Sequence, residues 1–338
     1  MIQTTKILLL SFCFFIVSNT LFAANYPSVK LNNKAMEVMV FLPDSTTSYY
    51  QAARFDWGSM VGQITYNGHT FLQQWENYNG RGPADKHNPL VPNTGTGLAE
   101  EFLAALGYDE APVNGFFVKI GVGILQKKDT TNYSFAIPYK IVNQGIRTFS
   151  QTKNSLTFKH SLNSEIGYGY ELERTYQLID NKLIVHHKLT NTGKKRIESE
   201  MISHNFMQFD FGAFGTDFSL QFLKSTIDNS NQKWTSPNRV KFNDSSIDIL
   251  TDMNDYTPCF GGINVHTKNG NCRLINKKTG MAVTIEPDKE VSSFVAWMWQ
   301  KAFCAEPRIL VDVEPGKSFS WDFVYGFEVR PLNPLKGT

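Results

Sequence analysis

Alternation of hydrophobic and polar positions is the main pattern of this chain, and it is clearest near the C-terminus. Between residues 319 and 329, every odd position is apolar or aromatic and the even positions are mostly small or polar. Successive side chains of a strand point to opposite faces, so this pattern predicts a half-buried β-strand. Glu306 lies just upstream, followed by Pro307, where we expect a strand to give way to a loop. Loops on a rigid scaffold often hold functional residues, which makes Glu306 a candidate.

The same alternation recurs along most of the chain. Residues 170–178 and 183–189 predict a hairpin with Asp180 and Asn181 in its turn, and residues 196–211 predict a long strand. Further strands are expected at 36–42, 59–66, 116–125, 133–143, 155–160, 217–223, 271–276, 281–286 and 291–299. Helical periodicity is confined to residues 98–106, which Gly107 would end. These patterns favour one large all-β domain, a β-sandwich, with the Gly-, Asn- and Pro-rich stretch 77–97 as a long loop.

The first residues have the pattern of an export signal. Lys6 precedes an apolar run from residue 7 to 17, and small and polar residues lead to an expected cleavage site after Ala23. We therefore expect a signal peptide at residues 1–23, a mature domain at 24–338, and a periplasmic or secreted protein. The run is too short for a membrane span, and no later run matches it without charges. Cys13 raises the alternative of a lipid anchor, although the bulky Phe12 precedes it.

Charge and cysteine content narrow the function classes. The 33 basic and 31 acidic residues nearly balance, which gives no electrostatic support for nucleic-acid binding. Aromatic residues form 13% of the chain, which suits either a β core or surfaces that stack on sugars. Cys259 and Cys272 are the candidates for a disulfide in an oxidising compartment, and Cys304 fits a small packed hydrophobe better than a nucleophile. No cysteine spacing fits a metal site.

A second candidate for chemistry is His204. Strand alternation through residues 200–210 would place its imidazole on a polar face that also carries Gln208 and Asp210. Histidine is the side chain best suited to give or take a proton near neutral pH. A lone strand histidine is more often structural, but Glu306 offers this one a partner.

Several blocks resemble a known group of proteins. In the first half of the chain these blocks are residues 54–58, continuing to Gly68 and His69, then 97–102 and 115–123. In the second half they are His204-Asn205-Phe206, and Cys304-Ala305-Glu306-Pro307 followed by Pro315-Gly316. With these blocks the sequence resembles the aldose 1-epimerase, or galactose mutarotase-like, superfamily, in particular a branch of bacterial epimerase-like proteins. The resemblance extends over nearly the whole mature chain.

The resemblance implies a fold and a reaction. The fold would be a β-supersandwich of large twisted antiparallel sheets with few short helices, binding a sugar or oligosaccharide in a concave cleft. Glu306 would act as general base on the anomeric hydroxyl and His204 as general acid on the ring oxygen, so that α and β anomers interconvert. The reaction would need no metal and no organic cofactor.

Further residues are candidates for sugar contacts. Arg54, Glu101 and Lys119 lie within the family-like blocks, Asp210 follows the histidine block, and Trp299 shares a strand face with Trp297. A structural role is the alternative for each. Many aldose epimerases carry another, upstream histidine, for which His69 and His87 are the candidates here.

Two other functions stay open at this point. One is a non-catalytic sugar-binding protein that keeps the fold, which the unmatched upstream histidine favours. The other is a polysaccharide-cleaving enzyme, since related sandwiches host such chemistry. A glycosidase would want two carboxylates across the cleft, and only Glu306 stands out. The sequence carries no signal for the particular sugar or for the oligomeric state.

Overall fold

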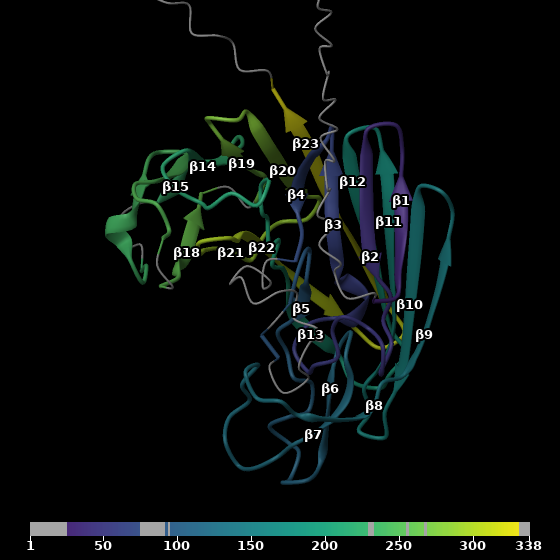
Figure 1. Cartoon of the computed structure of the whole chain (residues 1–338). Helices are drawn as coiled ribbons and strands as arrows, with labels where there is room; N and C mark the ends of the chain where they lie inside the picture. Colours follow the sequence, from purple (N-terminus) through teal and green to yellow (C-terminus); the bar gives the residue numbers. More distant parts are fainter. Residues whose placement is uncertain are drawn as a thin grey trace, which may run out of the picture.

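The computed structural model describes residues 26–74, 92–93, 95–228, 233–254, 257–266 and 269–330, and these are built almost entirely from antiparallel strands (Figure 1). The described residues contain two 3-10 turns, η1 (Trp57–Ser59) and η3 (Pro237–Arg239), and no α-helix. The all-β prediction is therefore confirmed. The expected signal peptide, and most of the expected loop at 77–97, lie outside the described residues. No described helix is long and apolar enough to cross a membrane.

One layer is a ten-stranded sheet, whose strands β9 to β12 are on the right of Figure 1. Its order is β16 (Val240–Phe242), β17 (Ser246–Ile249), β14 (Phe218–Phe222), β19 (Cys272–Asn276), β20 (Met281–Pro287), β23 (Ser318–Val329), β12 (Lys182–Asn191), β11 (Gly169–Ile179), β10 (Ser155–Asn163) and β9 (Ile146–Gln151). The predicted hairpin is β11 and β12, with Asp180 at φ 52° in its turn.

The opposite layer combines two sheets. A six-stranded sheet has the order β15 (Ile227–Asp228), β18 (Cys259–Val265), β21 (Ser293–Met298), β22 (Phe303–Val313), β13 (Ile197–Ser203) and β5 (Glu100–Phe102). A four-stranded sheet has the order β1 (Ser28–Asn32), β2 (Met36–Phe41), β3 (Val61–Tyr66) and β4 (His69–Leu72). Met207 joins them through isolated bridges to Leu72 and Phe303. A small sheet of β6 (Phe116–Lys119), β7 (Gly123–Gln126) and β8 (Lys140–Asn143) lies at the bottom of Figure 1.

The main hydrophobic core lies between these layers. Phe71 of β4 meets Phe327 of β23 at 5.2 Å between ring centroids, and Phe222 of β14 meets Phe294 of β21 at 5.0 Å. On β23, Trp321 and the following odd positions to 327 are buried, as the alternation predicts. Burial of apolar area at roughly 25 cal/mol per Å² makes this core the main source of stability.

Four local predictions are wrong. Residues 98–106 form no helix, because Glu100–Phe102 pairs with β13 as an edge strand. Residues 116–125 form a hairpin, because Gly121 and Gly123 take positive φ between β6 and β7. Residues 133–143 contribute a strand only from Lys140, and the strand predicted at 196–211 ends at Ser203.

The cysteines in the described residues are all free and buried: Cys259, Cys272 and Cys304. The disulfide considered between Cys259 and Cys272 is absent: the two residues lie on β18 and β19, in different sheets, and both are free. Burial raises the pKa of the Cys304 thiol well above its usual range, as befits a packed hydrophobe rather than a nucleophile.

Candidate active site

Glu306 lies inside β22, not on a loop at the rim as the sequence suggested. The strand continues to Val313, because β21 pairs with it on one side and β13 on the other. Alternation turns Cys304, Glu306 and Arg308 away from the core that separates the two layers, onto the outer face of the six-stranded sheet. The carboxylate is therefore held by a rigid central strand.

His204 reaches the same face by continuing the alternation of β13, in which Ile202 is the cross-strand partner of Arg308. It follows directly after β13, and Asn205 takes φ 52°, a left-handed conformation that asparagine tolerates better than most residues. The Asn205 amide donates to the Ala305 carbonyl at 2.7 Å, and its oxygen accepts from Tyr325 and Ser203, both at 2.9 Å. This network fixes the turn that ends the strand pattern just after His204.

The structure brings the two residues predicted to be catalytic into direct contact. His204 Nδ1 lies 2.9 Å from Glu306 Oε1, and His204 Nε2 lies 3.2 Å from Glu101 Oε2. Both ring nitrogens thus face carboxylates, an arrangement that a doubly protonated imidazolium satisfies. His204 and Glu306 are each only 5% exposed.

Glu101 is held by two cations. Arg54 Nε donates to its Oε2 at 2.7 Å, and Lys119 Nζ lies 3.4 Å from its Oε1. Lys119 also donates to the backbone carbonyls of Phe102 and Leu103, so its buried ammonium group is well supplied with acceptors. The predicted substrate contacts Arg54, Glu101 and Lys119 therefore form one network beside the His204–Glu306 pair.

The electrostatics follow from this network. Burial opposes a charge on His204, but Glu306 and Glu101 outweigh it and raise the pKa of the imidazole. Burial likewise opposes a charge on Glu101, yet Lys119 and Arg54 hold the pKa of its carboxyl well below the usual range. Burial lowers the pKa of the Lys119 ammonium. The network thus favours an ionised Glu101 carboxylate and a protonated His204 imidazolium.

Aromatic rings surround the imidazole. Phe55 contacts it edge-on with ring centroids 5.0 Å apart, and Phe206 stacks on it at 5.8 Å. Phe206 in turn meets Trp297, which lies 6.4 Å from Trp299. Trp299, predicted to contact substrate, is therefore at the far end of an aromatic series that begins at His204.

Asp210 lies in a different environment from the one its predicted role requires. Its carboxylate accepts from the Thr70 amide and contacts His69 Nδ1, both at 2.7 Å. The described contacts thus tie Asp210 and His69 to β4 at an exposed position, and they do not join either residue to His204. Asp210 itself takes φ 46°, so the strand alternation that placed it beside His204 does not hold there. His87, the other candidate for the upstream histidine, lies outside the described residues.

A second charged cluster, which sequence reasoning missed, is buried between the layers. Arg174 of β11 donates to Asp56 Oδ2 at 2.7 Å and to Glu100, and His187 Nε2 lies 2.8 Å from Glu100 Oε1. Its four members are distant in sequence, and the only signal was the adjacent pair Glu100-Glu101 within a family-like block. Burial opposes their charges, but Arg174 holds the carboxyl pKa values of Asp56 and Glu100 below the usual range.

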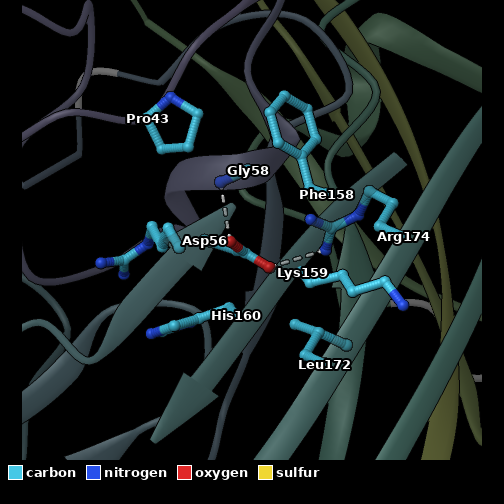
Figure 2. Close-up of a pocket in the computed structure, with 9 residues that line it drawn as sticks. Pro43, Asp56, Gly58, Phe158, Lys159, His160, Leu172 and Arg174 are labelled. Atoms are coloured by element: carbon cyan, nitrogen blue, oxygen red, sulfur yellow. Dashed lines mark hydrogen bonds and ion pairs between the residues drawn. The ribbon is translucent and has the colours of Figure 1, made fainter. Parts of the chain in front are cut away.

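Figure 2 shows a small cavity beside this second cluster, with Asp56, His160 and Arg174 in its wall. Its volume is about 10 Å³, which suffices for one water molecule and not for a sugar. No group of three or more His, Cys, Asp or Glu side chains in the described part of the chain is placed to hold a metal ion. The His204–Glu306 pair is therefore the better candidate for chemistry.

Comparisons with solved structures define the class of fold. The chain is similar to a galactose mutarotase-related enzyme from Lactobacillus acidophilus, with 15% identity over 90% of this chain and 100% of that one and a TM-score of 0.54. It is similar to an aldose epimerase homologue from C. elegans, with 13% identity over 90% and 99% of the two chains and a TM-score of 0.52. This architecture is the galactose mutarotase-like fold.

A third neighbour has the same fold. A galactose mutarotase-like protein from Clostridium acetobutylicum is 12% identical over 90% of this chain and 95% of that one, with a TM-score of 0.53. No family model and no curated protein matches the chain. The resemblance seen in the sequence is thus confirmed at the level of fold, and function must be argued from the site.

Proposed function

We propose that this protein is a carbohydrate isomerase of the aldose 1-epimerase type, which interconverts the α and β anomers of a reducing sugar. The observation that carries the proposal is the 2.9 Å contact between His204 Nδ1 and Glu306 Oε1 on the outer face of the six-stranded sheet. The fold neighbours are called aldose epimerase and galactose mutarotase-like proteins, which supports the same reaction class. We propose further that the chain acts after export, as its first residues indicate.

The reaction needs one base and one acid close together. Glu306 removes the proton from the anomeric hydroxyl, while the His204 imidazolium donates a proton to the ring oxygen. Both oxygens are bonded to the anomeric carbon, so an acid and a base within one hydrogen bond of each other can serve both. The C1–O5 bond breaks, the aldehyde turns about the C1–C2 bond, and the reverse transfers close the ring. A positioned acid and base each contribute roughly 10²–10⁴-fold.

The surrounding network keeps the acid charged. Glu101 beside Nε2 raises the proton affinity of the His204 ring, and Arg54 and Lys119 keep Glu101 anionic. In this proposal Glu101 is a positioning residue. Arg54 is the member of the network nearest to solvent, with a side chain 15% exposed, so it is the best placed to meet a sugar hydroxyl.

A non-catalytic sugar-binding protein is the second candidate, and a specific observation favours it. His204 is 5% exposed and both its ring nitrogens already have carboxylate partners, so a sugar must displace a contact before it can accept a proton. Under this candidate the buried pair would be structural. Sugar would then bind without any change in its rate of mutarotation.

Polarimetry of freshly dissolved aldoses distinguishes the two candidates. We expect the wild type to accelerate mutarotation, and Glu306→Gln and His204→Ala each to lose the acceleration while keeping a folded circular dichroism spectrum. Leu310→Ala, an exposed position of β22 on the same sheet face, is the matched control and keeps the rate. Sugar binding without acceleration by the wild type would instead support the binding protein.

A further inference from the structure

A groove lies on the outer face of the six-stranded sheet, the face that also carries Glu306. It is lined by Lys233, Trp234, Thr235, Phe260, Gly261, Gly262, Val295 and Arg308, and its volume is about 460 Å³. This volume lies within the usual range of small-molecule sites, roughly 300–1,000 Å³. The groove is open to solvent, unlike the buried His204–Glu306 pair.

The strand register places the groove in one row with Glu306. Gly262 of β18 is the cross-strand partner of Val295 of β21, and Val295 is the partner of Glu306 of β22. Directly opposed residues of antiparallel strands point to the same face, so these three form one row across the sheet. Neighbouring strands are about 4.8 Å apart, so Gly262 and Glu306 are roughly 10 Å apart. Two linked pyranose rings can span that separation.

The floor and walls of the groove have the chemistry of a sugar subsite. Gly262 forms the floor, and a Cβ added there would meet no atom within 4 Å. Phe260, two residues earlier on the same face, is 40% exposed, so its ring is available to the apolar C–H face of a pyranose. The exposed Phe260 side chain and the bare Gly262 backbone together make a flat surface of the size of one ring.

Arg308 supplies hydrogen-bond donors beside this surface. It lies two residues after Glu306 on the same face of β22, and its Nη1 is 3.6 Å from Glu200 Oε2. Its buried Nε has no hydrogen-bond partner among the described residues. The Arg308 side chain is 23% exposed, so the solvent-accessible part of its guanidinium can donate to a hydroxyl or carboxylate oxygen of a ligand. Lys233, which also lines the groove, is a second cationic residue.

We infer that this groove binds a second sugar unit, so that the substrate is a reducing oligosaccharide whose first ring meets His204 and Glu306. The inference rests on the proposed function only in placing the first, reducing ring at His204 and Glu306. Gly262 and Glu306 belong to one row of cross-strand partners, so a single sugar chain would extend over both residues. For this reason we take a sugar chain as the occupant of the groove. Arg308 and Lys233 favour a second unit that carries a carboxylate.

The test compares sugars that share a reducing ring and differ only in the presence of a second ring. Anomer exchange is measured by saturation-transfer NMR at equilibrium for glucose, maltose, cellobiose and lactose, and for galacturonate and digalacturonate. We expect at least one disaccharide to exceed its monosaccharide in kcat/KM by roughly tenfold, which corresponds to about 1.4 kcal/mol. Equal values in every comparison would overturn the inference.

Two substitutions test the groove itself. Gly262→Trp fills the floor of the groove, where there is room for a side chain. Phe260→Ala removes the exposed aromatic ring. Each variant should bring the disaccharide-to-monosaccharide ratio of kcat/KM close to one. The matched controls are Leu310→Trp, which adds bulk at an exposed position farther along β22, and Phe149→Ala, which removes an exposed ring from β9; both should keep the ratio. A ratio that survives both groove variants would contradict the inference.

A binding measurement separates this inference from the proposed function. Saturation-transfer difference NMR on the same disaccharides should show contacts from the non-reducing ring, and Phe260→Ala should remove them. If no sugar is isomerised but these contacts appear and depend on Phe260, the proposed function fails and the groove stands. If monosaccharides are isomerised and no contact from a second ring appears, the groove inference fails and the proposed function stands.

Discussion

Two neighbouring glutamates of β5, Glu100 and Glu101, build two charge clusters of similar composition on opposite faces of one strand. Glu100 faces the core and contacts Arg174 and His187. Glu101 faces outward and contacts Arg54 and His204. Each cluster thus contains a histidine, an arginine and a second carboxylate, Asp56 in the inner cluster and Glu306 in the outer one.

The difference between the clusters is their relation to solvent and to ligand. The side chains of the inner cluster are at most 3% exposed, and its adjoining cavity accommodates one water molecule. The outer cluster includes a partly exposed Arg54 and shares its sheet face with an open groove. Charged residues with shifted pKa values are therefore an insufficient sign of catalysis, because a structural network shows the same shifts. We infer that the inner cluster holds the layers together and that the outer one performs the chemistry.

The largest expected effect is on stability, and it should differ between Arg174 of the inner cluster and Arg54 of the outer cluster. Arg174→Met leaves Asp56 and Glu100 buried without their main counter-charge, so the free energy of unfolding should fall by about 3–5 kcal/mol. Arg54→Met is the matched control: Glu101 keeps Lys119, and the loss should stay near 1 kcal/mol. Urea unfolding followed by tryptophan fluorescence measures both. Equal losses would mean that the outer cluster is structural too.

A smaller effect, on rate, should follow removal of the Glu101 charge. Glu101→Gln takes away one of the two carboxylates that raise the pKa of His204, so the alkaline limb of the pH–rate profile should move to lower pH. At pH 7 the rate should fall by roughly tenfold, a change of about 1.4 kcal/mol. Glu198→Gln, which alters an exposed carboxylate beside Arg196, is the control and should leave the profile in place. An unmoved profile in Glu101→Gln would exclude its positioning role.

The smallest effects are opposite dependences of stability on pH for two histidines. The pKa of His204 is raised in the folded protein, so its contribution is complete below its unfolded pKa, near 6.5, and is lost as pH rises through the folded pKa. Burial and the nearby Arg147 lower the pKa of His160 to about 3, so its contribution is complete above about pH 6.5 and is lost as pH falls toward 3.

Urea unfolding at pH values from 4 to 9 tests this pair of signs. The stability difference between wild type and His204→Gln should shrink as pH rises above neutrality. The difference between wild type and His160→Gln should shrink as pH falls below neutrality. The same sign for both variants would contradict the electrostatic distinction between the two sites.

The sequence predicted the strands better than it predicted the positions of the site residues. Alternation is set by burial of one face, so β23 and the β11–β12 hairpin follow it closely. It failed at Asn205, because a side-chain network with Ser203 and Tyr325 stabilises a left-handed turn that no period can reveal. The break lies after His204, so it moved Asp210 away, whereas His204 keeps the position opposite Glu306 that the alternation of β13 gives it.

Long-range contacts explain the remaining failures. A short apolar stretch at 98–106 has weak helical periodicity, and pairing with β13 together with two charge clusters outweighs it. The inner cluster draws on residues 56, 100, 174 and 187, whose proximity depends on the finished sandwich. Glu306 and His204 could be proposed from motif resemblance, but their hydrogen bond could not.

The most direct test of the central claim, that His204 and Glu306 act together as acid and base, is a double-mutant cycle on the rate of mutarotation. Wild type, His204→Asn, Glu306→Gln and the double variant are compared by anomer-exchange NMR with the sugar that the wild type isomerises fastest. Each single variant should lose roughly 10²–10⁴-fold, and the double variant should lose little more than either, because removal of one partner disables the other. Single variants that keep the wild-type rate, or losses that multiply as for independent residues, would contradict the claim.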